Sequence, residues 1–258
     1  MIYEIHIKDP SETPIPWWHK VPWLQRESFT FGPGLTILFG PNGSGKSTLL
    51  LALARLFHCA QGGVPVITES SIREFTYRNR TIADKTLRSL DSLSVKHDGR
   101  IKGFFEAGKR IGAAGGYFDD DFFDDGVRST LMRGSHGETH LDALARILSH
   151  SCEPVADRVG KRVNDLWLSW REQVLAFLAP NAEPGPPTLL LDEPDRSLSI
   201  PRRVELWRAL LDASKRVQIL LASHDSLCLR LPPDRVTYLE TEPGYLNRCR
   251  AALADPFV

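Results

Sequence analysis

Residues 40–47 read Gly-Pro-Asn-Gly-Ser-Gly-Lys-Ser, and this stretch decides the fold. It fits the complete pattern of a phosphate-binding loop: a glycine, any four residues, a second glycine, a lysine, and a serine or threonine. Glycines let backbone N–H groups curl around phosphate oxygens, and the positive end of a following helix faces the same anion. We therefore expect phosphate binding by Gly40, Pro41, Asn42, Gly43, Ser44, Gly45, Lys46, Ser47 and Thr48.

The polar side chains of this loop are predicted to have separate roles. Lys46 would reach the β and γ phosphates of ATP, and the Ser47 hydroxyl would hold a magnesium ion that bridges the same two phosphates. Thr48 would lie nearer the α-phosphate. ATP and Mg²⁺ are thus the cofactors that the loop predicts.

The segments around the loop have the context that a phosphate loop needs. Apolar residues at 2–7, 29–31 and 35–39 predict three strands, so that the chain begins with a β-layer. The run STLLLALARLFH at 47–58 has no glycine or proline and predicts a buried helix. Strand, loop and helix therefore follow in the required order.

A second apolar strand ends in acidic residues. Thr188 to Asp192 reads TLLLD and is followed by Glu193, which is typical of a Walker B segment. Asp192 would hold magnesium, and Glu193 would activate the attacking water as general base. We expect Lys46, Glu193 and His224 to be catalytic, and Ser47 and Asp192 to be the metal ligands.

His224 follows a third core strand, at 218–222, in the sequence Ser-His-Asp. At the end of that strand it would contact the γ-phosphate or the water. A predicted helix near 202–215 connects the strand at 188–192 to this one, and two apolar strands with a helix between them favour parallel pairing. The predicted fold class is therefore α/β, with ligands at the carboxyl ends of the strands.

The predicted organisation is one domain of 258 residues, 42% of them hydrophobic. Residues 1–59 and 186–258 would form the nucleotide-binding core, and residues 60–185 an inserted lobe with a helical region, including a long helix near 155–178. Positive and negative residues balance at 32 each, so that any contact with nucleic acid must be a local patch.

Four widely spaced cysteines suit neither a zinc site nor a disulfide framework, which favours reduced thiols in the cytosol. No stretch approaches the roughly 18 apolar residues of a membrane helix, and the first residues carry no apolar signal core. We expect a cytoplasmic protein without direct membrane insertion.

Together, GPNGSGKST, LLLDEP and LLASHD resemble the ABC ATPase superfamily, and in particular its SMC-like and RecF-like branch. More narrowly, the chain is similar to small bacterial ATPases of this kind. The resemblance implies a P-loop ABC-type nucleotide-binding domain. It also implies an ATPase whose site is completed when two copies pair around ATP.

Two further segments take their roles from this resemblance. Ser135, His136, Gly137 and Glu138 are similar to the signature motif, which would bind the γ-phosphate held by the other copy. Asp195 and Ser197 are similar to the D-loop, which would face its twin across the dimer. Taken alone, Ser-His-Gly-Glu is also an ordinary helix start.

The chain departs from the family at the Q-loop. Gln61 is the only glutamine between the phosphate loop and the signature, and it lies too close to the loop. Glu106 is a candidate for that metal-sensing place, although a surface carboxylate is the simpler interpretation. For stacking on adenine, Trp17, Trp18 and Trp23 all remain candidates.

Three function hypotheses follow, and the intact Glu193 argues against the third, an ATP-gated scaffold that binds nucleotide without useful hydrolysis. The first is an SMC-like or RecF-like ATPase that drives a process on nucleic acid or a partner effector, in DNA maintenance or antiphage defence. The alternative is the nucleotide-binding subunit of an ABC transporter, against which the missing Q-loop counts. Residues Arg73 to Arg80 combine positive charges with aromatic rings, which is typical of a nucleic-acid-binding surface but also of a solvated strand face. The acidic residues from Asp119 to Asp125 could bind a basic partner or form an acidic surface loop.

Overall fold

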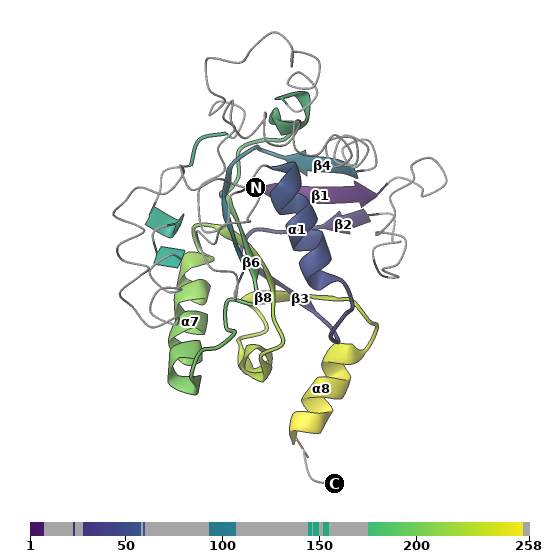
Figure 1. Cartoon of the computed structure of the whole chain (residues 1–258), viewed down its shortest axis with the longest axis vertical. Helices are drawn as coiled ribbons and strands as arrows, with labels where there is room; N and C mark the ends of the chain where they lie inside the picture. The colour runs from purple at the N-terminus through teal and green to yellow at the C-terminus, as the bar shows by residue number, and fades with distance from the viewer. Residues whose placement is uncertain are drawn as a thin grey trace, which may run out of the picture.

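The computed structural model describes residues 1–7, 23, 28–57, 59, 93–106, 144–145, 147–149, 152–154 and 175–254, and the structural statements below concern these. Two β-sheets dominate this part of the chain (Figure 1). The larger has five strands in the order β5 (Ile101–Glu106), β6 (Thr188–Asp192), β7 (Gln218–Ala222), β3 (Leu35–Phe39) and β8 (Val236–Glu240). The smaller has the order β2 (Ser28–Thr30), β1 (Ile2–Ile7) and β4 (Leu93–His97).

All four pairings in the five-stranded sheet are parallel, whereas β1 pairs antiparallel with both of its neighbours. The structure thus confirms the predicted α/β class with a parallel sheet and an N-terminal β-layer. The strands at 188–192 and 218–222 begin and end where the sequence predicts them.

The parallel sheet has an apolar core on each face, because alternate side chains of a strand point to opposite sides. Leu190 and Leu220 belong to the core that also contains α1 (Lys46–Leu56) and the small sheet. Leu191 and Leu221 belong to the core that contains α7 (Ile200–Ala213). Every residue of β3, β6 and β7 is buried, which explains why these strands read as continuous apolar runs rather than alternating ones.

Two further helices follow the last strands. The 3₁₀-helix η6 (Ser226–Arg230) comes after β7, and α8 (Tyr245–Ala254) comes after β8. Figure 1 shows α8 directed away from the sheets. Only Leu246 of this helix is buried. None of the helices in the described part of the chain has the length and apolar character needed to cross a bilayer.

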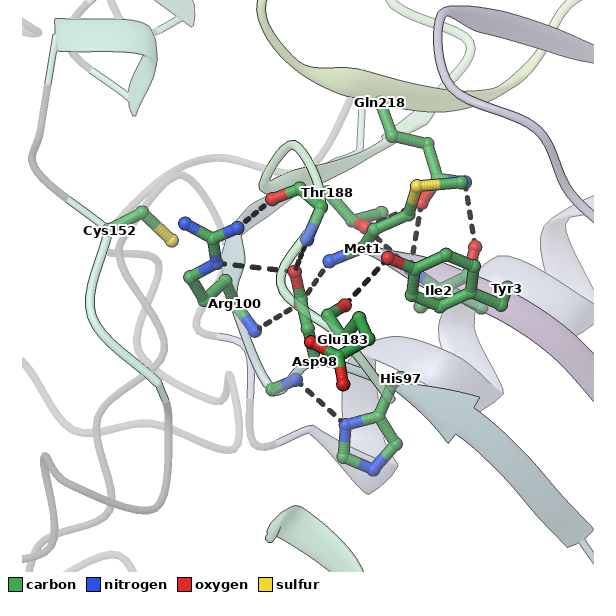
Figure 2. Close-up of polar contacts among 12 residues, drawn as sticks. Met1, Ile2, Tyr3, His97, Asp98, Arg100, Cys152, Glu183, Thr188 and Gln218 are labelled. Atoms are coloured by element: carbon green, nitrogen blue, oxygen red, sulfur yellow. Dashed lines mark hydrogen bonds and ion pairs between the residues drawn. The ribbon is translucent and has the colours of Figure 1, made fainter. Parts of the chain in front are cut away.

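A single buried amide ties the two sheets together at the amino end of the parallel strands (Figure 2). The Gln218 carbonyl oxygen accepts from Ile2 N at 2.9 Å and from the Thr188 hydroxyl at 2.6 Å. Its NH₂ group donates to Ile2 O at 2.7 Å and to Gly32 O at 2.9 Å. An amide has two acceptor and two donor sites, so all four are used.

A second polar group lies beside this amide. The Asp98 carboxylate pairs with the Met1 amino group and with Arg100, and it accepts from Gly185 N at 2.8 Å (Figure 2). Asp98 is 3% exposed, so these partners compensate the charge that burial would otherwise penalise. The segment between β4 and β5 is thereby attached to the loop before β6.

Part of the predicted inserted lobe at 60–185 pairs with strands outside it. Residues 93–106 form β4 and β5, which pair with β1 and β6. The strand character of IKGFFE at 101–106 is visible in the sequence, but the strand that it pairs with is not, because pairing joins segments far apart in the chain.

Replacing Gln218 by leucine tests the amide link. The substitution keeps the volume but leaves the buried Ile2 carbonyl without this donor and the buried Thr188 hydroxyl without this acceptor. Each unsatisfied group costs about 1–3 kcal/mol. We expect the free energy of unfolding, measured by urea titration, to fall by roughly 3 kcal/mol. Arg216→Ala, at an exposed site two residues away, is the control and should stay within about 0.5 kcal/mol of the wild type. Equal stability of the two variants would contradict the link.

Candidate functional site

The predicted site residues meet at one edge of the parallel sheet, where the strands end. Register pairs Asp192 with Ala222, and Leu38 with the same alanine, so that β6, β7 and β3 end at one level. Gly40 follows β3, Glu193 follows β6 and His224 follows β7 by two residues. Parallel strands present their carboxyl ends together, and this is the edge where α/β sheets bind ligands.

The phosphate loop forms the turn from β3 into α1, and all nine predicted residues from Gly40 to Thr48 are described. Gly43 and Gly45 have φ angles of 75° and 94°, the left-handed region in which glycine is favoured. Ser44 N donates to Pro41 O at 3.3 Å and closes the turn. Helix α1 begins at Lys46, so that its unpaired N–H groups and positive dipole end face the loop.

Lys46 is held inside the loop. Its ammonium donates to Gly40 O at 3.0 Å and Pro41 O at 2.9 Å, and the residue is 4% exposed. Burial lowers the pKa of Lys46 to about 8, against the opposing effect of the nearby Glu193 and Asp192 carboxylates. The loop therefore holds a buried positive charge that a bound anion can neutralise.

Ser47 and Asp192, the two predicted metal ligands, are in direct contact. The Ser47 hydroxyl donates to Asp192 Oδ1 at 2.8 Å, which joins the first turn of α1 to the end of β6. Both offer oxygen, the donor that Mg²⁺ prefers, and magnesium sites commonly use one or two protein ligands together with waters and phosphates. No group of three acidic, histidine or cysteine ligands occurs in the described chain.

The backbone of Glu193, directly after β6, has an unusual conformation. Its φ is 48°, which is uncommon for a residue with a side chain. Its N–H still donates to Ala222 O at 2.9 Å, so the turn is anchored to β7. The carboxylate is partly exposed and lies 3.5 Å from His224 Nε2 and 3.4 Å from Arg196. The predicted base and the predicted histidine are therefore neighbours.

His224 is neutral near pH 7. Burial, and then the positive charge of Lys46, lower the pKa of its imidazole, while Glu193 acts in the opposite direction. A neutral ring carries one N–H, which can donate to a carboxylate or a phosphate oxygen. Because the contact with Glu193 is long, the imidazole is not locked onto that carboxylate.

A buried polar network, which no sequence motif indicates, holds the turn that carries His224. Asp225 accepts from Trp207 Nε1 at 2.9 Å and from Leu227 N at 3.1 Å. The Arg203 guanidinium lies 3.6 Å from the same carboxylate. On the other side of His224, the buried Ser223 hydroxyl accepts from Asp225 N at 2.9 Å. Helix α7 thus fixes the turn that carries His224.

The signal for this network was weak. Asp225 stands next to His224 in Ser-His-Asp, but the spacing of Trp207 on its helix predicts only a residue packed in the core. The indole N–H, which must find a partner when buried, was the remaining indication.

The two residues predicted for the dimer interface differ in exposure. Ser197 is exposed and has a φ of 63°. Asp195 is buried, its Oδ1 has no hydrogen-bond partner in the described chain, and burial raises the pKa of its carboxyl group. Of the pair, only Ser197 is exposed.

Two more candidates are placed in part. Glu106 ends β5 as the register partner of Asp192, so its backbone lies at the same edge of the sheet. Trp23 is 4% exposed, contacts Phe29 edge to face and donates to Ser44 O at 2.5 Å. Trp23 therefore supports the phosphate loop from behind instead of presenting an open face to adenine.

The other predictions lie outside the described residues. They are Trp17, Trp18, Gln61, the segments Arg73 to Arg80 and Asp119 to Asp125, the residues Ser135, His136, Gly137 and Glu138, and most of the predicted helix near 155–178.

One comparison with known proteins covers the phosphate loop. A family model described as an AAA domain matches residues 20–59, which contain the loop, β3 and α1. No curated protein matches the chain. Among solved structures, it is similar to an ABC transporter ATP-binding protein from Pyrococcus furiosus, with 14% identity, a TM-score of 0.34, and 92% of this chain and 97% of that chain covered. At that TM-score the likeness supports no conclusion about function.

Trp207→Phe tests the network behind His224. The variant keeps an aromatic ring in the core but removes the donor to the buried Asp225 carboxylate, which we expect to lower the free energy of unfolding by about 1–3 kcal/mol. Urea denaturation monitored by circular dichroism measures the change. Leu210→Met, a near-isosteric change on the same face of α7, controls for packing and should cost less than about 1.5 kcal/mol. A smaller loss in Trp207→Phe than in this control would argue against the hydrogen bond.

Proposed function

We propose that this protein binds and hydrolyses ATP with Mg²⁺, and that it does so as a pair of copies closed around the nucleotide. The observation that carries the proposal is the contact between Ser47 and Asp192 at 2.8 Å, with Lys46 and Glu193 on the same edge of the sheet. A lysine in a glycine loop, a hydroxyl paired with a carboxylate, and a second carboxylate one residue on are the parts that phosphoryl transfer from ATP requires.

The binding step belongs to the loop and to Lys46. Backbone N–H groups of residues 43–48 and the start of α1 would bind the phosphate oxygens, and Lys46 would exchange the carbonyls of Gly40 and Pro41 for the β and γ phosphates. Triphosphate would also hold the Lys46 ammonium in its charged form, since an anion compensates the burial that lowers its pKa.

The metal would be held by Ser47 and Asp192. When bound, Mg²⁺ neutralises charge on the β and γ phosphates. The present contact between hydroxyl and carboxylate keeps both oxygens at one place, so little rearrangement is needed for them to share an ion.

Proton abstraction is assigned to Glu193. Its carboxylate lies at the strand end beside the loop and is partly exposed, so it can accept a proton from a water that attacks the γ-phosphate. His224, neutral at pH 7, can donate its N–H to the γ-phosphate or orient the water. Glu193 has a left-handed backbone conformation, and the chain turns out of the sheet at this residue.

The pairing of two copies is supported by the sequence of the signature segment and by the exposure of Ser197. In the proposed dimer, Ser135, His136, Gly137 and Glu138 of one copy bind the γ-phosphate held by the other. Ser197 is exposed on the turn after Glu193, and in the proposed dimer it would face the second copy. Nucleotide thereby acts as part of the interface.

For the process that ATP drives, we propose the role implied by the resemblance to SMC-like and RecF-like ATPases: action on nucleic acid or on a partner effector, in DNA maintenance or antiphage defence, in the cytoplasm. Measuring ATP turnover with and without double-stranded DNA tests the nucleic-acid arm. Stimulation supports it. Turnover that responds to membranes carrying a partner and not to DNA would favour the transporter subunit instead.

Glu193→Gln should trap the ATP-bound pair. The amide keeps the size of the side chain but cannot accept the proton, so we expect turnover to fall by about 10²–10⁴-fold while ATP binding survives. Sedimentation with ATP should show a dimer. Glu205→Gln, at an exposed carboxylate of α7, is the matched control and should turn over ATP like the wild type. Only monomer with ATP present would reject the paired site.

Lys46→Ala should abolish ATP-dependent association. Loss of the buried counter-charge weakens ATP binding by about 10- to 100-fold, as expected for one or two charge-assisted hydrogen bonds. Calorimetry measures the affinity, and sedimentation measures the association. Lys215→Ala removes an exposed ammonium and should leave both unchanged. An unaltered ATP affinity in Lys46→Ala would contradict the assignment.

A further inference from the structure

The residue that follows the last strand of the sheet contacts the phosphate loop from the far end of the chain. Strand β8 pairs with β3 so that Glu240 is opposite Phe39. Thr241 comes next, and its N–H donates to Phe39 O at 2.9 Å, which continues the ladder by one residue. Its side chain therefore lies level with Gly40, the first residue of the loop.

The approach of Thr241 to Gly40 is close enough to require glycine. A Cβ added to Gly40 would lie 1.7 Å from Thr241 Oγ1 and 3.0 Å from Thr241 Cβ. Gly40 is not among the residues with positive φ, whereas Gly43 and Gly45 are. The sequence pattern explains all three glycines by backbone freedom, but at Gly40 the reason is the neighbouring side chain.

The contact between Thr241 and the loop is also polar. Thr241 Oγ1 lies 2.8 Å from Ser44 Oγ, and Thr241 is 7% exposed. Ser44 has two further restraints, because its hydroxyl lies 3.5 Å from Lys46 Nζ and its carbonyl accepts from Trp23. A hydroxyl has two acceptor sites and one proton. With Thr241 and Lys46 both donating to it, Ser44 has its own proton left for an anion.

Thr241 is itself firmly placed. The Glu240 carboxylate accepts from Leu246 N at 3.1 Å, in the first turn of α8, so the segment between β8 and α8 is attached at both ends. A side chain on such a segment can impose a position on a glycine-rich loop, which has few side-chain contacts of its own.

We propose that Thr241 is a positioning residue of the phosphate loop: through its hydroxyl it orients Ser44, and through its bulk it fixes the path of Gly40. The proposal rests on the ATP binding proposed above but on neither hydrolysis nor pairing. Thr241 does not touch the phosphates. It acts through the loop, so its effect should appear only for ligands whose phosphates the loop holds.

The test compares ATP with AMP in three variants. Thr241→Val keeps the shape and removes the hydroxyl, and should weaken ATP binding by about five- to tenfold, the equivalent of one hydrogen bond. Thr241→Ser keeps the hydroxyl and should restore the affinity to within about twofold of the wild type. AMP lacks the β and γ phosphates, so its dissociation constant should not differ between the variants. Calorimetry with each nucleotide provides the numbers.

Ser44→Ala completes a double-mutant cycle. Because it breaks the same hydrogen bond from the loop side, Thr241→Val should add little to the loss in a Ser44→Ala background. If the loss of ATP-binding free energy in the double variant equals the sum of the two single losses, the proposal is overturned. So does an unchanged ATP affinity in Thr241→Val accompanied by a lower Tm, or an equal loss for ATP and AMP, since either would mean a role in packing alone.

Two outcomes are kept distinct. A wild type that does not bind ATP refutes the proposed function, whereas a wild type that binds ATP and a Thr241→Val variant that binds it equally well refute this inference only. If Thr241→Val does not fold, the ATP affinity of Ser44→Ala decides, because Ser44 lies in a surface loop. An unchanged affinity in Ser44→Ala would refute the inference, since Thr241 is proposed to act through the Ser44 hydroxyl.

Discussion

The hydrogen bond between Ser47 and Asp192 is the interaction on which the site depends, because it joins two segments 145 residues apart in the chain. Ser47 stands in the first turn of α1 and Asp192 at the last position of β6. Their contact requires that β3 and β6 lie in one sheet, with β7 between them and all three running in the same direction. The parallel sheet therefore brings the residues of the candidate site together.

Charge is concentrated at this edge of the sheet. Lys46 is buried among backbone carbonyls, with its pKa lowered to about 8, and two carboxylates lie nearby. His224 remains neutral under the influence of burial and of the same lysine. Such an arrangement favours a ligand that brings several negative charges and a divalent cation together, since either alone would leave one sign in excess.

The rest of the molecule keeps the edge in place. At the opposite end of the strands, the Gln218 amide binds β1, β6 and β7 together with no unused donor or acceptor. On the α7 side, Trp207 and Arg203 hold Asp225, and with it the turn of His224. Glu193 and His224 thus lie on short turns between strands and helices that buried polar contacts hold in place. In a dry interior such contacts have few alternative arrangements.

The sequence by itself determined the phosphate loop, the two acidic strand-end residues and the α/β class. These features are local: the loop needs glycines in a set order, and a buried parallel strand needs an apolar run before its carboxylate. Tertiary structure alone decided that residues 93–106 pair with β1 and β6, that Trp23 and Thr241 contact the phosphate loop, and that Asp225 is held by side chains of α7. Each of these depends on contacts between residues far apart in the chain. A side chain such as that of Thr241 carries no mark of the partner it meets, because the partner is selected by strand order and register, which no local pattern encodes.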